Sequence, residues 1–287
     1  MIDERSSADP SARGRAALLA GPATWALLFL LLPLLVMVAM SAGSRPDAGG
    51  VRYDASFEAY RWLGDHTADV SRTAWRSARI AGLATLLCVL LATPVAWWIA
   101  RAKESRRPLL LLLIVVPSWT SFLLRTYAWK FLFGVEGPIN RLLGSLGVEP
   151  VRFLNTELAV VIGLVYGYLP FAVLPIYVAV ERLDRDLLAA ARDLGAGPIR
   201  TFASVAFPLT LAGTLAGATL VFVPSLAAFV TPKVLGGVDT YMIGEMTQDR
   251  FLQGRDWPTG AVLGIALTVA AIVALVPAAA ARRSSRA

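Results

Sequence analysis

The sequence has few of the residues on which most catalytic and metal sites depend. It contains one cysteine, Cys88, and one histidine, His66, in 287 residues. A single cysteine cannot form an intrachain disulfide or a cluster of thiolate ligands, and we expect Cys88, inside an apolar run, to be a small buried residue. His66 lies in a polar segment without metal-ligating neighbours. The sequence therefore predicts no catalytic site and no metal site, which argues against a membrane-embedded enzyme.

What the sequence has instead is apolar length. Hydrophobic residues make up 56% of the chain and charged residues 16%, with a mean hydropathy of +0.62, outside the range of ordinary soluble domains. A helix needs about 20 apolar residues to cross a bilayer. The candidate spans are Ala23–Met40, Ile80–Ala100, Pro108–Leu124, Leu158–Val180, Leu209–Val230 and Pro258–Ala280. The sequence thus predicts an all-α membrane protein with six transmembrane helices.

The basic residues between the spans predict the orientation. Segments 1–22, 101–107, 181–208 and 281–287 carry three, four, four and three Arg or Lys residues, whereas segments 41–72, 134–157 and 231–257, which are longer in total, carry four, two and three. Cytosolic loops are enriched in Arg and Lys, so we expect both termini inside, as cytosolic tails of a membrane domain spanning 23–280. This bias also accounts for the net charge of +7 without a nucleic-acid partner.

The cytosolic segment 181–208 has the pattern of two short helices. The polar face of the first helix contains Arg185, Asp186, Arg192 and Asp193. Its apolar face contains Leu187, Leu188, Ala190, Ala191 and Leu194. Asp184 is suited to the N-cap, Gly195 to the C′ position, and Pro198 to the start of a second helix carrying Ile199, Phe202, Val205 and Ala206 on one face. A compact helical knob is predicted, although interfacial helices that merely connect two spans would show the same pattern.

One motif in this knob resembles the EAA loop of ABC importer permeases. The family pattern reads Glu-Ala-Ala, three residues, Gly, nine residues, Ile, one residue, Leu-Pro. The residues that match it in register are Ala190, Ala191, Gly195 and Pro208. Val205 and Phe207 stand in place of Ile and Leu, and Ala189 replaces the Glu. The resemblance implies a type I ABC importer permease fold, in which this loop docks on a cytosolic ATPase.

The resemblance also implies partners and a coupling surface. The partners are a second permease subunit, two copies of an ABC ATPase that bind ATP and Mg²⁺, and a periplasmic substrate-binding protein, all at the bacterial inner membrane. The residues it places at the ATPase are Arg185, Asp186, Ala190, Ala191, Arg192, Asp193, Gly195 and Pro208. Because Ala189 falls within the polar arc and lacks a charge, we expect Arg185, Arg192 and Asp193 to make the polar contacts.

The energy source is constrained by what is missing. None of the three lysines, Lys103, Lys130 and Lys233, lies in a Gly-x-x-x-x-Gly-Lys-Ser/Thr loop, so no ATP site or other cofactor is expected in this chain. The cores of the six spans contain no Asp, Glu or His, whereas ion-coupled carriers usually hold ionisable groups deep in the bilayer. An external ATPase is therefore favoured, and an ion-coupled secondary transporter is the alternative.

A second resemblance bears on the substrate. The segments 117–129, 137–140, 236–237 and 255–258 resemble the first permease subunit of spermidine/putrescine importers, which implies polyamines or a related small organic cation. Amino-acid conjugates and phosphonates are alternatives within the family. Aromatic faces attract ammonium groups, and the candidates for such a path are Trp119, Tyr127, Trp129, Tyr166 and Tyr168. Interface or core packing would explain the same aromatics.

Three further features predict local structure. Gly213 and Gly217 allow close approach of another helix, and prolines and glycines in the span Leu158–Val180 suit a helix beside a path. Arg125 would repel a polycation, so we expect it to face a headgroup or an acid such as Glu136.

Overall fold

Helices make up nearly all of the regular structure in the computed structural model, which describes residues 10–284. Within that part of the chain there is no strand, only two isolated bridges. The elements are α1 (Pro10–Ser41), α2 (Glu58–Asp65), α3 (Thr67–Arg101), η1 (Glu104–Arg106), α4 (Arg107–Val115), η2 (Val116–Trp119), α5 (Phe122–Leu132), α6 (Pro138–Ser145), α7 (Glu157–Glu181), α8 (Arg185–Asp193), α9 (Pro198–Thr201), the π-helical turn η3 (Phe202–Ala206), α10 (Phe207–Leu226), α11 (Val230–Leu235), η4 (Val238–Thr240), α12 (Ile243–Leu252) and α13 (Trp257–Ser284).

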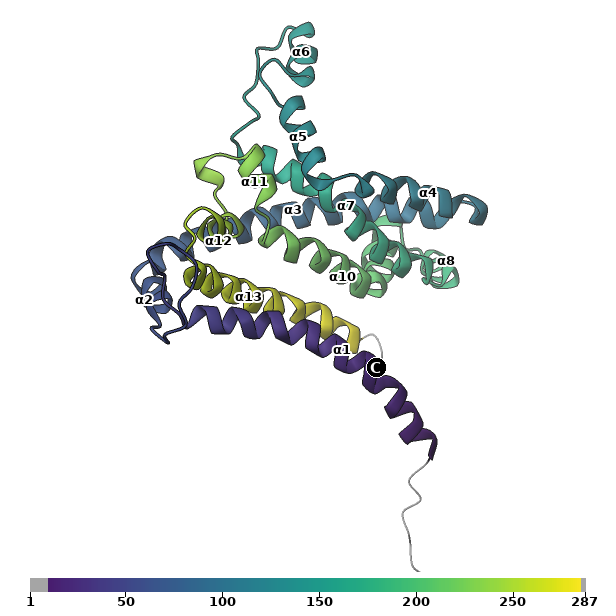
Figure 1. Cartoon of the computed structure of the whole chain (residues 1–287). Coiled ribbons are helices and arrows are strands. Elements are labelled where there is room, and N and C mark those ends of the chain that lie inside the picture. The colour runs from purple at the N-terminus through teal and green to yellow at the C-terminus, as the bar shows by residue number, and fades with distance from the viewer. Residues whose placement is uncertain (1–9, 285–287) are drawn as a thin grey trace, which may run out of the picture.

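The predicted number of spans is confirmed. Five helical stretches are long and apolar enough to cross a bilayer, and they lie in α1, α3, α7, α9–α10 and α13. The sixth is the bent pair formed by Glu104–Trp119 and Phe122–Leu132. The knob helix α8, the beginning of α1 and the end of α13 lie at the same end of the molecule (Figure 1), as the predicted inside location of both termini requires.

Three helices, α3, α7 and α10, form the core. Their buried residues make two clusters, one around Ile99, Val173 and Ile176 and the other around Ile80 and Leu164. Helix α13 packs on α10, and α1 packs along α13, with its side chains mostly exposed. In Figure 1 the core helices and the α1–α13 pair run in roughly the same direction.

The predicted close approach at the two glycines of α10 is confirmed. A Cβ on Gly213 would lie 2.8 Å from the carbonyl oxygen of Pro175 and against the Ala179 side chain, and one on Gly217 would lie 3.0 Å from the carbonyl oxygen of Ala172. Helix α10 therefore meets the backbone of α7 directly. Between helices in lipid, where both sides are apolar, such contact is a main source of attraction.

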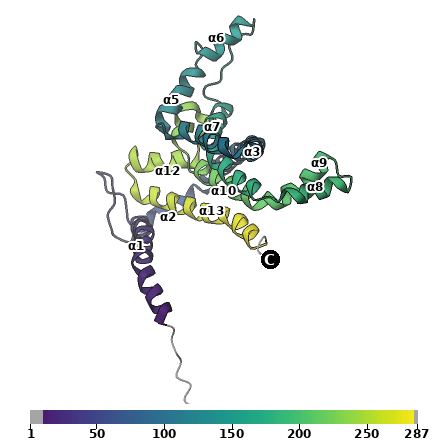
Figure 2. The ribbon, with the colours of Figure 1, turned by 90° about the vertical axis from the view of Figure 1, so that its right-hand side faces the viewer.

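The third predicted span is not a straight helix. Its two parts meet at 86°, and α5 and α6 extend away from the bundle in both views (Figures 1 and 2). Pro117 has no N–H to donate to the preceding turn, and the Ser118 and Thr120 hydroxyls donate to the carbonyls of Val115 and Pro117 at 2.6 and 2.8 Å. These side chains satisfy backbone groups that the interrupted helix leaves free. Apolarity alone did not reveal the break.

The fifth predicted span also ends earlier than expected. Helix α10 stops at Leu226, after Pro224, and the apolar residues that follow begin the separate helix α11. Leu235 and Thr231 of α11 are buried and sit where a Cβ on Gly163 of α7 would lie. The sequence predicts one helix here because the apolar run continues without a charge through this turn.

Helix α3 extends beyond its predicted start and contacts the loops at the outer end. It begins at Thr67, and its Arg76 donates to the carbonyl oxygen of Val238 at 3.3 Å, while Arg79 pairs with Glu157 of α7. The buried Ser77 hydroxyl accepts the N–H of Ile243, the first residue of α12. These contacts hold the outer loops on the ends of the core helices.

One acid, Glu245 of α12, is buried at this outer end. Only 6% of its surface is exposed, and its carboxylate accepts the N–H of Met242 at 3.0 Å. Burial raises the pKa of Glu245 to about 7, the Met242 N–H lowers it, and nearby Asp249 adds to the rise. Burial and the hydrogen bond to Asp249 likewise raise the pKa of Tyr241.

Adding one methyl group at Gly213 should weaken the α7–α10 contact. Gly213→Ala is expected to lower stability by about 1–3 kcal/mol, because the new Cβ overpacks against backbone that cannot retreat. The matched control is Gly82→Ala on α3, where no atom lies within 4 Å of the added Cβ and the change should be neutral or stabilising by about 0.5–1 kcal/mol. Thermal unfolding in detergent measures both, and equal melting temperatures for the two variants would contradict the contact.

Glu245→Gln should change how stability depends on pH. The raised pKa means that, as pH rises from about 4.5 to 7, the unfolded chain loses this proton while the folded chain keeps it, so the wild type loses stability across that window. The difference in unfolding free energy between the variant and the wild type should therefore be about 1–3 kcal/mol more favourable to the variant at pH 7.5 than at pH 4.5. Exposed Glu149→Gln is the control, with no such gain; a pH-independent difference for Glu245→Gln would refute the assignment.

Candidate functional site

The knob between α7 and α10 begins with a helix that is capped at both ends. The Asp184 carboxylate accepts the N–H of Asp186 at 2.9 Å, as the sequence predicted for an N-cap. At the other end Gly195 has φ +81° and donates to the carbonyl oxygen of Arg192 at 2.8 Å, and the N–H of Ala196 reaches the carbonyl oxygen of Ala191 at 3.1 Å. This pair of bonds is a Schellman motif, which needs a left-handed residue at the C′ position. The predicted C′ position of Gly195 is confirmed.

The second half of the knob is continuous with α10. Helix α9 starts at Pro198, as predicted, and passes through the π turn η3 into Phe207. The predicted shared face is wrong in part, because Ile199 is 85% exposed while Ala206 is buried. A π turn inserts an extra residue into the helix, so residues before and after it lose their expected phase.

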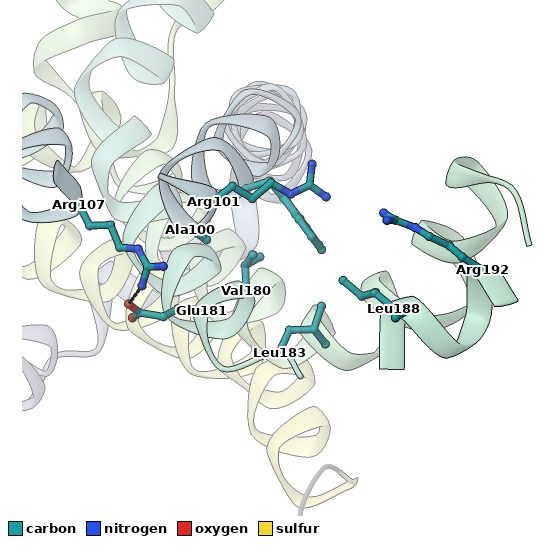
Figure 3. A pocket seen from close by; sticks show the side chains of 10 residues that line it. Ala100, Arg101, Arg107, Val180, Glu181, Leu183, Leu188 and Arg192 are labelled. Carbon is teal, nitrogen blue, oxygen red and sulfur yellow. Dashed lines mark hydrogen bonds and ion pairs between the residues drawn. The ribbon is translucent and has the colours of Figure 1, made fainter. Parts of the chain in front are cut away.

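The inner side of α8 faces the membrane domain of its own chain. Leu188, Ala189 and Arg192 line a cavity of about 370 Å³ together with Trp97 and Arg101 of α3. Figure 3 shows Arg192 extending from the knob toward the end of α3. The sequence predicts Arg192 at the ATPase, and the structure leaves Ala189 and Arg192 exposed while both also line this cavity beside α3.

The outer side of α8 and its C-terminal end project away from the bundle. Leu187 is 48% exposed and Leu194 is 89% exposed, and Asp186, Ala190 and Asp193 are also exposed. Figure 2 shows α8 and α9 lying to one side of the core helices. Pro208 lies in the first turn of α10, and α8 begins at Arg185. Most residues predicted to contact the ATPase are thus on one projecting element.

A polar network at the base of the knob was not predicted. Arg107 of α4 pairs with Glu181 at 3.2 Å, and the Tyr177 hydroxyl donates to the same carboxylate oxygen at 2.6 Å. The network ties the start of α4 to the end of α7, where the knob begins. The sequence indicated Arg107 only as one of four bases in a short loop, because its partner lies 74 residues away.

Of the five aromatic residues predicted to line a path, the structure places Trp129 and Tyr166 in contact, whereas Tyr168 contacts Phe122. Trp129 of α5 packs edge-on against Tyr166 of α7 with ring centroids 5.5 Å apart, and Tyr168 stacks on Phe122 at 6.2 Å. Tyr166 remains 43% exposed. Helix α5 leaves the bundle after the bend and still contacts α7 and α11.

The other two candidate aromatics lie apart from this group. Trp119, at the end of η2, is 74% exposed, and Tyr127 faces Lys130, whose ammonium lies 5.9 Å from the ring centroid. Arg125 does not pair with Glu136 as expected. Its guanidinium lies over the Phe122 ring at 5.6 Å, and its Nε is buried without a hydrogen-bond partner among the described residues.

No cluster of three or more His, Cys, Asp or Glu side chains occurs among residues 10–284. Cys88 is buried in α3, and His66 stacks on Trp62 with ring centroids 4.6 Å apart. The arrangement as a whole offers a projecting helical knob and an aromatic group between helices.

Comparison with known sequences identifies the family. The family described as binding-protein-dependent transport system inner membrane component matches residues 81–286. The spermidine/putrescine transport system permease protein PotB of Haemophilus influenzae is 40% identical over 248 residues, covering 86% of each chain. PotB of Escherichia coli is 40% identical over 247 residues, covering 85% of this chain and 89% of the relative.

Solved structures show the same fold at lower sequence similarity. A bacterial ABC transporter that imports the acidic polysaccharide alginate has a chain with a TM-score of 0.67 and 18% identity, covering 96% of this chain and 97% of that one. A chain of the MetNI methionine ABC transporter in an inward-facing conformation has a TM-score of 0.55 and 15% identity, covering 79% and 96%. This protein belongs to the binding-protein-dependent transport system inner membrane components and is an ABC importer permease, a transport subunit of the inner membrane and not an enzyme.

Proposed function

We propose that this permease serves an importer of polyamines such as spermidine and putrescine, or of a related small organic cation. The observation that carries the proposal is the 40% identity to PotB across 86% of both chains. The aromatic pair Trp129 and Tyr166, which are 5.5 Å apart between ring centroids, supports it, because aromatic faces attract ammonium groups by roughly 0.5–2 kcal/mol each. Amino-acid conjugates and phosphonates are the alternative substrates.

We further propose that the knob is the joint to a cytosolic ATPase. Its apolar residues Leu187 and Leu194 project from the membrane domain, and a partner would bury them. The assembly would contain a second permease subunit, two copies of the ATPase, which bind ATP and Mg²⁺, and a periplasmic substrate-binding protein on the outer loops. A related alginate importer has been solved with its substrate-loaded periplasmic protein.

The packing of the knob suggests how ATP hydrolysis is converted to movement. Both of its ends continue into core helices, Glu181 closing α7 and Phe207 opening α10. Because α7 and α10 touch backbone to backbone at Gly213 and Gly217, a pull on the knob moves them as one unit. ATP-driven closure of the two ATPases would then draw the knobs together and favour the state open to the periplasm.

Replacing Gly195 should uncouple ATP hydrolysis from uptake. Gly195→Val places a β-branched residue at φ +81°, a conformation that costs ordinary L-residues about 1–2 kcal/mol, and should distort the end of α8. We expect membrane insertion to be retained and substrate uptake per ATP hydrolysed to fall.

The control for this change lies two residues away. Gly197 also has open space around its Cβ position, but its φ is −66°, so Gly197→Val introduces similar bulk without strain. Uptake and ATPase activity measured in proteoliposomes separate the two. Full coupling in Gly195→Val would show that the capped end of α8 is not part of the joint.

Aromatic residues that line the path should affect the half-saturation for substrate. Tyr166→Leu is expected to raise the half-saturation concentration of a cationic substrate by about twofold to thirtyfold, which is the range expected for the loss of one cation–π contact. Two variants serve as controls. Trp119→Leu changes an aromatic residue that lies apart from the group, and Trp75→Leu removes an exposed aromatic residue near the outer end of α3. Initial uptake rates measure all three; an unchanged half-saturation for Tyr166→Leu would remove it from the path.

A further inference from the structure

The cavity between the knob and the end of α3 has an unusual lining. Its volume of about 370 Å³ is many times the roughly 10–15 Å³ that one water molecule requires. Three arginines and a single acid, Glu181, line it, and Figure 3 shows Arg101 and Arg192 reaching toward the same space from opposite sides. Ala189 contributes only a methyl group at this wall.

The charges in this cavity are not balanced by the chain itself. Glu181 is engaged by Arg107 at 3.2 Å and by the Tyr177 hydroxyl. For Arg101 and Arg192, no ion pair is found with any residue of the described part of the chain. Both arginines are exposed, so water screens part of their mutual repulsion, and an anion between them would offset the rest.

A neutral donor lines the same cavity. The Nε1 of Trp97 is buried and has no hydrogen-bond partner among the described residues. A buried polar group without a partner costs free energy, which a bound acceptor would recover. The Arg101 guanidinium lies 5.2 Å from the centroid of the Trp97 ring, so an acceptor at Nε1 lies close to a positive charge.

A second, more apolar cavity, called the furrow below, adjoins this basic cavity. The furrow has a volume of about 440 Å³ and shares Trp97, Arg101, Leu188 and Arg192 with the first cavity. It is also lined by Pro94, farther inside the span of α3, and by residues of the second half of the knob, among them Phe202 and Ala206. A ligand that fills both spaces has an anionic head and an apolar tail.

The position in the membrane selects the source of such a ligand. Arg101 is the last residue of α3 and follows Trp97 and Trp98, and tryptophans favour the headgroup level of a bilayer. The cytosolic leaflet contains anionic lipids, which attract basic residues at its surface. We propose that this cavity binds the phosphate headgroup of an anionic phospholipid between Arg101, Arg192 and Trp97, with an acyl chain in the adjoining furrow.

Lipid bound there would join α3 to the knob. Arg101 and Trp97 belong to the core bundle, whereas Arg192 belongs to α8, so the phosphate bridges the two. The lipid composition of the inner leaflet would then adjust how firmly the knob is held before any ATPase acts on it.

Native mass spectrometry of the full chain tests the site. The protein, purified with any subunits that accompany it, is released from nanodiscs containing phosphatidylglycerol, and retained lipid is counted. Arg101→Gln and Arg192→Gln should each lower retention by about fivefold, whereas Arg192→Lys, which keeps the charge, should restore most of it. Arg106→Gln, an exposed base of the same cytosolic loop that does not line the cavity, is the control and should match wild type.

A second pair of variants tests the position of the anion. Ala189→Glu places a carboxylate in the cavity and should displace the phospholipid, while Ala189→Gln adds similar bulk without charge and should retain it. Melting temperatures near wild type show that the variants are folded. Equal lipid retention in all the variants would overturn the proposal.

Varying the bilayer composition distinguishes two sources of the bound anion, a lipid phosphate and a carboxylate of a partner subunit. If the Arg101 and Arg192 variants lost a co-purified ATPase equally in phosphatidylglycerol and phosphatidylcholine nanodiscs, with retained lipid unchanged, the anion would be a carboxylate of that subunit and the proposal would be wrong. This experiment does not depend on the transported substrate, so it stands apart from the proposed polyamine function.

Discussion

The backbone contact between α7 and α10 is the interaction on which the rest of the structure depends. In a bilayer there is little hydrophobic drive between helices, so close packing of small residues must supply the attraction. Gly213 and Gly217 provide it against the segment of α7 that contains Ala172 and Pro175. Since the knob is suspended between these two helices, the same contact fixes the separation of its ends and makes it a rigid extension of the core.

The two ends of the bundle differ in how their charged side chains are paired. At the outer end, Arg79 pairs with Glu157 and Lys233 pairs with Asp249 at 2.8 Å, so helix ends and loops are joined within the chain. At the cytosolic end, basic residues exceed their acidic partners, and Arg101 faces a cavity. The cytosolic excess agrees with the retention of basic loops inside the cell, and it leaves this end able to bind anions.

The bend in the third span places the aromatic residues. After the 86° turn α5 leaves the core helices, and its Trp129 contacts Tyr166 of α7. Helix interruptions at membrane depth persist only where the freed backbone groups find partners, and Ser118 and Thr120 supply part of that need. The break is thus locally stabilised and gives the chain an aromatic group between helices.

The sequence by itself determined the helical class, the number of spans, their orientation and the caps of the knob at Asp184 and Gly195, because hydropathy, charge bias and capping chemistry act locally. Only the tertiary structure decided where α4 turns into α5, that Arg192 faces α3, and that Trp97 and Arg101 share a cavity with the knob. The last two outcomes depend on α3 and α8 lining one cavity although they lie about ninety residues apart in the chain, and a linear pattern does not show which distant side chains meet.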